Sequence, residues 1–114
     1  MIISTNRFIK KGLDARTFGF IILVRPDSIG DIPLIEHEKI HVKQFKANPI
    51  MFPLHYWLCR ECRLKYEVGA YKREIEVVGT LGRDVVSARN LYARYLVGNY
   101  RLGISYADAI LLLS

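Results

Sequence analysis

Two histidines and a glutamate lie in the middle of a stretch, DIPLIEHEKIHVKQF (residues 31–45), that otherwise has the apolar spacing of a core-facing helix. His37 and His41 are at positions i and i+4, so on a helix both rings project from one side, one turn apart. Glu38 lies about 100° around the helix from His37, beside the same buried face. An ionised carboxylate there would cost several kcal/mol without a partner. Whatever packs on this helix must therefore supply partners for these side chains.

A metal ion removes this cost. Two neutral imidazoles one turn apart can both bind Zn²⁺ at about 2.0–2.1 Å, and Glu38 then faces the open coordination position. There Glu38 can accept a proton from water and pass it to a leaving amine. The alternative, that HEKIH arose by chance on a charged helix, is disfavoured by its half-apolar helical context. We interpret His37 and His41 as zinc ligands and Glu38 as a catalytic general base.

The chain is predicted to form one domain, residues 1–114, of the α+β class and mainly helical. We expect a small two- or three-stranded sheet near the N-terminus, packed on the HExxH helix and on a glutamate-bearing helix, with further C-terminal helices. Asp31 is the expected N-cap of the HExxH helix, and Pro33 fits its first turn. The expected elements are strands over 2–9 and 17–25 and helices over 32–47, 55–78, 83–97 and 106–112.

A catalytic zinc ion needs a third protein ligand, and the helix predicted over 55–78 offers four glutamates: Glu61, Glu67, Glu74 and Glu76. Glu67 borders the apolar stripe of that helix in its middle, whereas Glu76 points away. We interpret Glu67 as the third ligand, and Tyr71, four residues on, as a residue of the catalytic site that can hydrogen-bond a ligand. The predicted stripe consists of Trp57, Leu64, Val68, Tyr71, Ile75 and Val78.

A strand, a HEKIH helix and a second helix carrying EVGAY together resemble the gluzincin metallopeptidases, and in particular the short metallopeptidase-like proteins of bacteriophages and bacteria. The resemblance spans roughly residues 17–78 and implies a zinc-dependent peptidase with Glu38 as general base and Glu67 as third ligand. It also implies that an edge strand, FIILV (20–24), pairs with an extended peptide substrate. The residues that match are His37, Glu38, His41, Gln44, Glu67, Ala70 and Tyr71.

The chain also departs from the larger gluzincins. It has no histidine after His55, so the group that would stabilise the oxyanion stays open among Tyr66, Tyr71 and His55. The peptidase activity could therefore be latent. An alternative function is that of a catalytically weak or inactive zinc-binding accessory protein of a phage or bacterium, which binds a protein or nucleic-acid partner. A third alternative is a structural zinc closed by a cysteine of the CRECR motif, Cys59 or Cys62.

The net charge and the two cysteines say less about the function than the HEKIH motif does. The net charge is +6, from 17 basic and 11 acidic residues spread along the chain, so an ordinary charged surface is favoured over a nucleic-acid interface. No apolar run approaches the ~18 residues of a membrane span, and the N-terminus lacks a secretory signal pattern. We expect a cytoplasmic protein that acts on a peptide or protein and not at a membrane; the oligomeric state is left open.

Cys59 and Cys62 are interpreted as buried, reduced thiols inside a helix.

Overall fold

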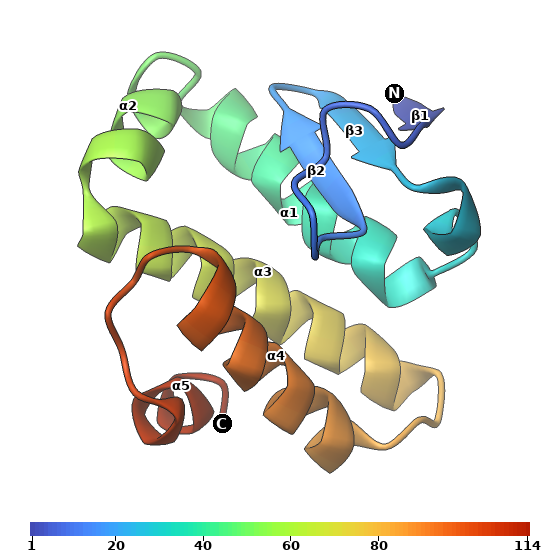
Figure 1. Ribbon diagram of the computed structural model, residues 1–114, viewed down its shortest axis with the longest axis vertical. Helices are drawn as coiled ribbons and strands as arrows, with labels where there is room; N and C mark the ends of the chain where they lie inside the picture. The colour runs from blue at the N-terminus through green and yellow to red at the C-terminus, as the bar shows by residue number, and fades with distance from the viewer.

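A computed structural model, which describes residues 1–114, confirms the expected α+β, mainly helical class. The HExxH helix α1 (Ile32–Ala47) lies between a three-stranded sheet on one side and the long helix α3 (Arg60–Thr80) on the other (Figure 1). Helix α4 (Val85–Asn99) packs on α3, and α5 (Tyr106–Leu112) packs on α4. The glutamate helix is thus enclosed between the HExxH helix and the C-terminal helices.

The sheet has the order β1-β3-β2, with β1 (Ile2–Ser4) parallel and β2 (Ala15–Phe18) antiparallel to the central strand β3 (Ile21–Val24). The prediction of one strand over 17–25 is wrong, because Gly19 turns the chain between β2 and β3. Gly19 has φ +59°, a left-handed conformation that a residue without a Cβ adopts readily. The edge strand beside the HExxH helix is therefore β2 and not the predicted segment 20–24.

The first strand is also shorter than predicted: β1 ends at Ser4, well before the expected end at residue 9. Phe8 has φ +63°, which is incompatible with an extended strand. After β3 a 3-10 helix, η1 (Pro26–Ser28), leads from the sheet toward α1. The loop between β1 and β2 is fixed by Arg25, whose guanidinium donates to the carbonyls of Leu13, Ile9 and Lys10 at 2.7, 3.2 and 3.3 Å.

Helix α1 has the predicted bounds because its end signals are local. The side chain of Asp31 accepts a hydrogen bond from the backbone N–H of Leu34 at 3.1 Å, as an N-cap does, and Pro33 lies in the first turn. One face of α1 covers the sheet, where Leu34 is one of the residues that pack on a small core. That core consists of Ala15, Ile22 and Val24, and the packing residues of α1 are Leu34, Ile35 and Val42.

The helix predicted over 55–78 is in fact two helices, α2 (Met51–Leu58) and α3, separated at Cys59. Cys59 has φ −112° and ψ 105°, and its sulfur accepts a hydrogen bond from the N–H of Cys62 at 3.1 Å, which caps α3. Because this break resets the helical phase, Trp57 is not on the buried stripe and is 73% exposed. The prediction of buried, reduced thiols is also wrong, since Cys59 and Cys62 are half-buried and form a disulfide.

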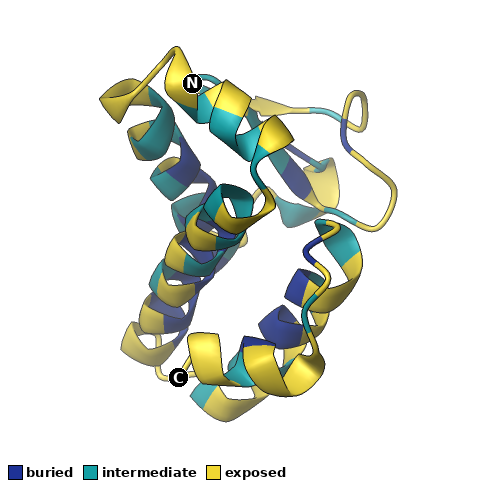
Figure 2. Cartoon of the chain, turned by 90° about the vertical axis from the view of Figure 1, so that its left-hand side faces the viewer, coloured by how far each residue is buried: buried dark blue, intermediate teal, exposed yellow.

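The C-terminal helices form the larger core with α3. Helix α4 begins two residues later than predicted, where Asp84 accepts a hydrogen bond from the N–H of Ser87, and α5 has the predicted bounds, with Ser105 as its N-cap. Buried residues gather on the faces that these helices turn toward one another (Figure 2). No helix combines the length and apolar character needed to cross a membrane. The core residues are Tyr71, Ile75, Tyr92, Ala93, Leu96, Leu102, Ala109 and Leu113.

Candidate metal centre

His37 and His41 from α1 meet Glu67 from α3 between the two helices. The Nε2 atom of His41 lies 2.6 Å from Oε1 of Glu67, and the Nε2 atom of His37 lies 3.9 Å from Oε2 of the same carboxylate. One potential ligand atom from each residue lies within 4.8 Å of the other two, and all three side chains are buried. The three ligands predicted from the sequence are therefore together, and this group could hold a metal ion.

Each histidine has a polar neighbour at its other ring nitrogen. The Nδ1 atom of His41 lies 2.8 Å from the side-chain oxygen of Gln44, whose amide nitrogen donates to the carbonyl of Tyr66 at 3.1 Å. The Nδ1 atom of His37 lies 2.9 Å from Oε1 of Glu74, but this contact lacks the geometry of a hydrogen bond, and both atoms are buried without a hydrogen-bond partner. A hydrogen bond such as that of His41 fixes the tautomer that directs Nε2 toward a metal. Glu74, an alternative ligand at the sequence level, thus lies behind His37 and outside the group.

The other candidate glutamates of α3 lie apart from the group. Glu61 is exposed near the start of α3, and Glu76 is exposed and pairs with Arg73 at 2.7 Å, so it points away as predicted. Glu67 is only 1% exposed. Two residues further along α3, Gly69 lies close to α1: a Cβ at this glycine would be 3.6 Å from the side-chain nitrogen of Gln44, which is an ordinary van der Waals contact.

The electrostatics of this group fit a cation. Burial alone would lower the pKa of His41, but the charge of Glu67 and the hydrogen bond to it outweigh burial and raise the pKa to about 9. Burial would likewise raise the pKa of Glu67, but the charge of His41 and that hydrogen bond keep it below its usual value. The Oε2 atom of Glu67 is nevertheless buried without a hydrogen-bond partner. The carboxylate is therefore only half satisfied by the protein, as a metal ligand would be.

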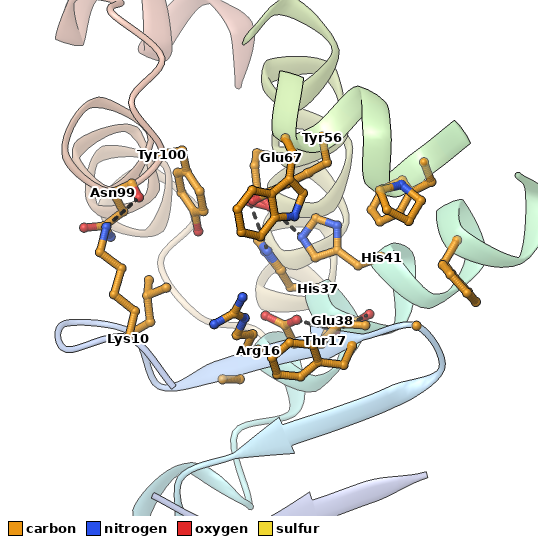
Figure 3. A pocket seen from close by; sticks show the side chains of 18 residues that line it. Lys10, Arg16, Thr17, His37, Glu38, His41, Tyr56, Glu67, Asn99 and Tyr100 are labelled. Atoms are coloured by element: carbon orange, nitrogen blue, oxygen red, sulfur yellow. Dashed lines mark hydrogen bonds and ion pairs between the residues drawn. The ribbon is translucent and has the colours of Figure 1, made fainter. Parts of the chain in front are cut away.

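Glu38 lies beside the three ligands and borders the same cavity, whose volume is about 390 Å³ (Figure 3). Its Oε2 atom accepts a hydrogen bond of 2.6 Å from the hydroxyl of Thr17 in the edge strand β2. No protein group donates to its Oε1 atom. The carboxylate is 6% exposed, so one oxygen is anchored and the other is available at the edge of the cavity.

The cavity has walls that differ in character. The loop before β2 and the end of α4 form one wall and supply Lys10, Leu13, Asn99 and Tyr100. The end of α1 and helix α2 form the opposite wall, which is largely aromatic. Strand β2 supplies Arg16, Thr17 and Phe18 between them. The aromatic wall consists of Phe45, Phe52, Pro53, Tyr56 and Trp57.

The tyrosines at the cavity are not those that the sequence suggested. Tyr71 packs its ring 4.3 Å from that of His37, but it does not line this cavity and instead contacts the hydroxyl of Tyr100 at 2.6 Å. The hydroxyl of Tyr66 lies 3.5 Å from Nδ1 of His55, and neither residue lines the cavity. Tyr56 and Tyr100 do line it. Sequence reasoning missed both because neither is at a fixed spacing from HEKIH or Glu67.

Burial and the negative charge of Glu67 raise the pKa of both Tyr56 and Tyr100 well above the usual value. Both phenols therefore stay protonated and can donate hydrogen bonds into the cavity. The hydroxyl of Tyr100 already bonds to that of Tyr71, whereas the hydroxyl of Tyr56 has no hydrogen bond within the protein. Tyr56 is thus the better placed of the two to donate to a bound molecule.

Arg63 of α3 holds both cavity walls in place. Its guanidinium donates to the carbonyl of Tyr56 at 2.8 Å on one side and to the carbonyls of Tyr100 and Arg101 at 2.8 and 3.3 Å on the other. Replacing Arg63 by methionine keeps the apolar stem but leaves these carbonyls without their donor. We expect a loss of about 2–4 kcal/mol in the free energy of unfolding, measured by urea denaturation. The matched change at the exposed Arg94 of α4 should cost less than about 0.5 kcal/mol; an equal effect at both positions would contradict this role.

Comparisons of the chain with family models, with curated proteins and with solved structures found no match. The resemblance to gluzincins therefore stays a prediction, and the interpretation of the site depends on its geometry and chemistry.

Proposed function

We propose that the protein is a zinc-dependent metallopeptidase in which His37, His41 and Glu67 bind the metal and Glu38 is the general base. The observation that carries the proposal is the buried group of two imidazoles and a half-satisfied carboxylate, bordered by a second, anchored carboxylate at the same cavity. Two histidines and a glutamate are a ligand set of catalytic zinc sites, which keep one position open. Calcium and magnesium prefer all-oxygen sites, so zinc is favoured over these ions.

Zinc in such a site would polarise the scissile carbonyl and lower the pKa of a water molecule. The part played by the chain follows from its own residues. Thr17 holds Oε2 of Glu38, so the free Oε1 can accept a proton from the attacking water and deliver it to the leaving amine. Tyr56 can donate its unpartnered hydroxyl to the developing oxyanion.

A peptide substrate is supported by the edge of the sheet. Strand β2 pairs only with β3, so its other edge has no neighbouring strand, and Arg16, Thr17 and Phe18 of β2 line the cavity. An extended peptide can add to such an edge through main-chain hydrogen bonds that do not depend on its sequence. Because the same strand anchors Glu38 through Thr17, a peptide bound here would lie next to the general base.

The proposal is tested by the metal dependence of hydrolysis. We expect the purified protein to bind one equivalent of zinc and then to cleave an unfolded protein substrate, such as fluorophore-labelled denatured casein. Removal of zinc by a chelator should abolish cleavage, and adding zinc back should restore it. A protein that binds one equivalent of zinc but cleaves none of a wide peptide library would instead favour the zinc-binding accessory protein. A folded protein that does not bind zinc would contradict both functions.

A further inference from the structure

Two basic side chains line the cavity beside the candidate metal centre without a carboxylate partner. Lys10 donates to the carbonyl of Asn99 at 3.3 Å, and Arg16 donates weakly to the carbonyl of Phe8 at 3.5 Å. The guanidinium carbon of Arg16 also lies 4.3 Å from the centre of the Phe18 ring. Figure 3 shows the guanidinium of Arg16 directed into the cavity and the ammonium group of Lys10 at its border. Both cations are therefore positioned by neutral groups only.

The sum of the charges that line the cavity leaves these two cations free to bind an anionic ligand. Its charged residues other than histidine are Lys10, Arg16, Glu38 and Glu67, which carry two positive and two negative charges that sum to zero. The proposed function uses Glu67 as a ligand and Glu38 as a base, and a divalent ion would bring the sum to +2. A cavity with a net positive charge and partly apolar walls attracts an anionic ligand. The negative group of such a ligand would bind at the end of the cavity where Lys10 and Arg16 lie, because neither side chain pairs with a carboxylate.

Of the two, Arg16 is the better recognition residue. Its side chain is half-buried and stacks on Phe18, so its planar fork is held in place and can bind a carboxylate through two hydrogen bonds. Lys10 is exposed and also contacts the last turn of α4, which gives it a structural role as well. The wall on the other side of the cavity, formed by α2 and the end of α1, is aromatic and offers no positive charge.

We propose that Arg16, assisted by Lys10, binds a carboxylate of the substrate. This inference rests on the proposed function and narrows its substrates to peptides that carry a carboxylate on the side of the scissile bond facing the N-terminal loop. The carboxylate has two sources: the α-carboxylate of a peptide C-terminus, or the side chain of an aspartate or glutamate. The first source would make the enzyme remove residues from the C-terminal end, and the second would make it cleave beside acidic residues.

Three hydroxamate peptides that share one apolar residue distinguish these cases, because a hydroxamate binds zinc directly. The first ends in an α-carboxylate, the second has a glutamate side chain and an amidated end, and the third is fully amidated. Their dissociation constants for the zinc-loaded protein are measured by calorimetry. We expect at least one carboxylate probe to bind about 10- to 100-fold more tightly than the neutral probe. In Arg16→Gln that ratio should fall to within about twofold, and in Lys10→Gln it should fall by less.

The matched control is Lys11→Gln, which removes an exposed charge next to Lys10 that does not line the cavity and should leave the ratio unchanged. Zinc content and thermal unfolding of each variant verify that the site and fold are retained. Equal binding of all three probes to the zinc-loaded wild type, or an unchanged ratio in Arg16→Gln, would overturn this inference while leaving the proposed function in place. A wild type that does not bind zinc would overturn the proposed function and this inference with it.

Discussion

Replacing Glu67 by glutamine is expected to lower the affinity of the protein for zinc roughly 100- to 1,000-fold. Binding of zinc by four ligands in peptides is worth about 10–16 kcal/mol, so the loss of one ligand corresponds to about 2.5–4 kcal/mol. Glutamine has nearly the same shape and keeps one oxygen that can accept from His41, which lies 2.6 Å from Oε1. The fold should therefore survive, and the affinity is measured by competition with a chromophoric chelator.

The matched control for this change is Glu61→Gln on the same helix. Because Glu61 is exposed, the Glu61→Gln variant should bind zinc with the same affinity as the wild type. Glu74→Gln tests the outer contact of His37 and should weaken binding by about 10- to 100-fold, as the loss of an orienting partner does. Wild-type affinity in Glu67→Gln together with loss of binding in Glu74→Gln would move the third ligand to Glu74.

The three candidate metal ligands could be predicted because each belongs to a local pattern. His37 and His41 are one helical turn apart, and the helix that carries them has its start signals, Asp31 and Pro33, in adjacent sequence. Glu67 could be chosen because the buried side of α3 is set by the period of its own apolar residues. Such signals need no knowledge of the tertiary structure. The expectation of an amphipathic HExxH helix facing a glutamate helix therefore agrees with the structure.

The remainder of the cavity could not be predicted, since it depends on segments that meet only in the folded chain. Arg16 and Tyr100 line one cavity although they come from β2 and from the end of α4. The apolar pattern around Trp57 continues into α3 in the sequence, so nothing local reveals that Cys59 adopts an extended conformation and separates two helices. Gly19 likewise lies within an apolar run that has strand propensity on both sides. In each case a single backbone conformation decides the structure against the surrounding pattern.

Replacing Glu38 by glutamine is expected to reduce kcat of peptide hydrolysis by about 10²- to 10⁴-fold, which is the usual contribution of a general base. The amide cannot accept the proton of the attacking water, but it retains an oxygen that can accept the hydrogen bond from Thr17. Because Glu38 is not one of the three ligand residues, zinc stoichiometry should stay at one equivalent. The measurement is the rate of cleavage at saturating peptide, with zinc content determined on the same sample.

The matched control is Glu36→Gln, two residues earlier on α1, whose carboxylate pairs with Lys39 and Arg73 outside the cavity. It should retain wild-type kcat within about twofold, because surface ion pairs contribute little even to stability. If Glu38→Gln kept its activity, water would have to be activated by another group, and the buried carboxylate anchored by Thr17 would need a structural explanation. The expected result is a Glu38→Gln variant that binds zinc but does not hydrolyse peptides, together with a Glu36→Gln variant that does both. This result would show that Glu38 is needed for hydrolysis and not for zinc binding, and that loss of a negative charge on α1 is not the cause.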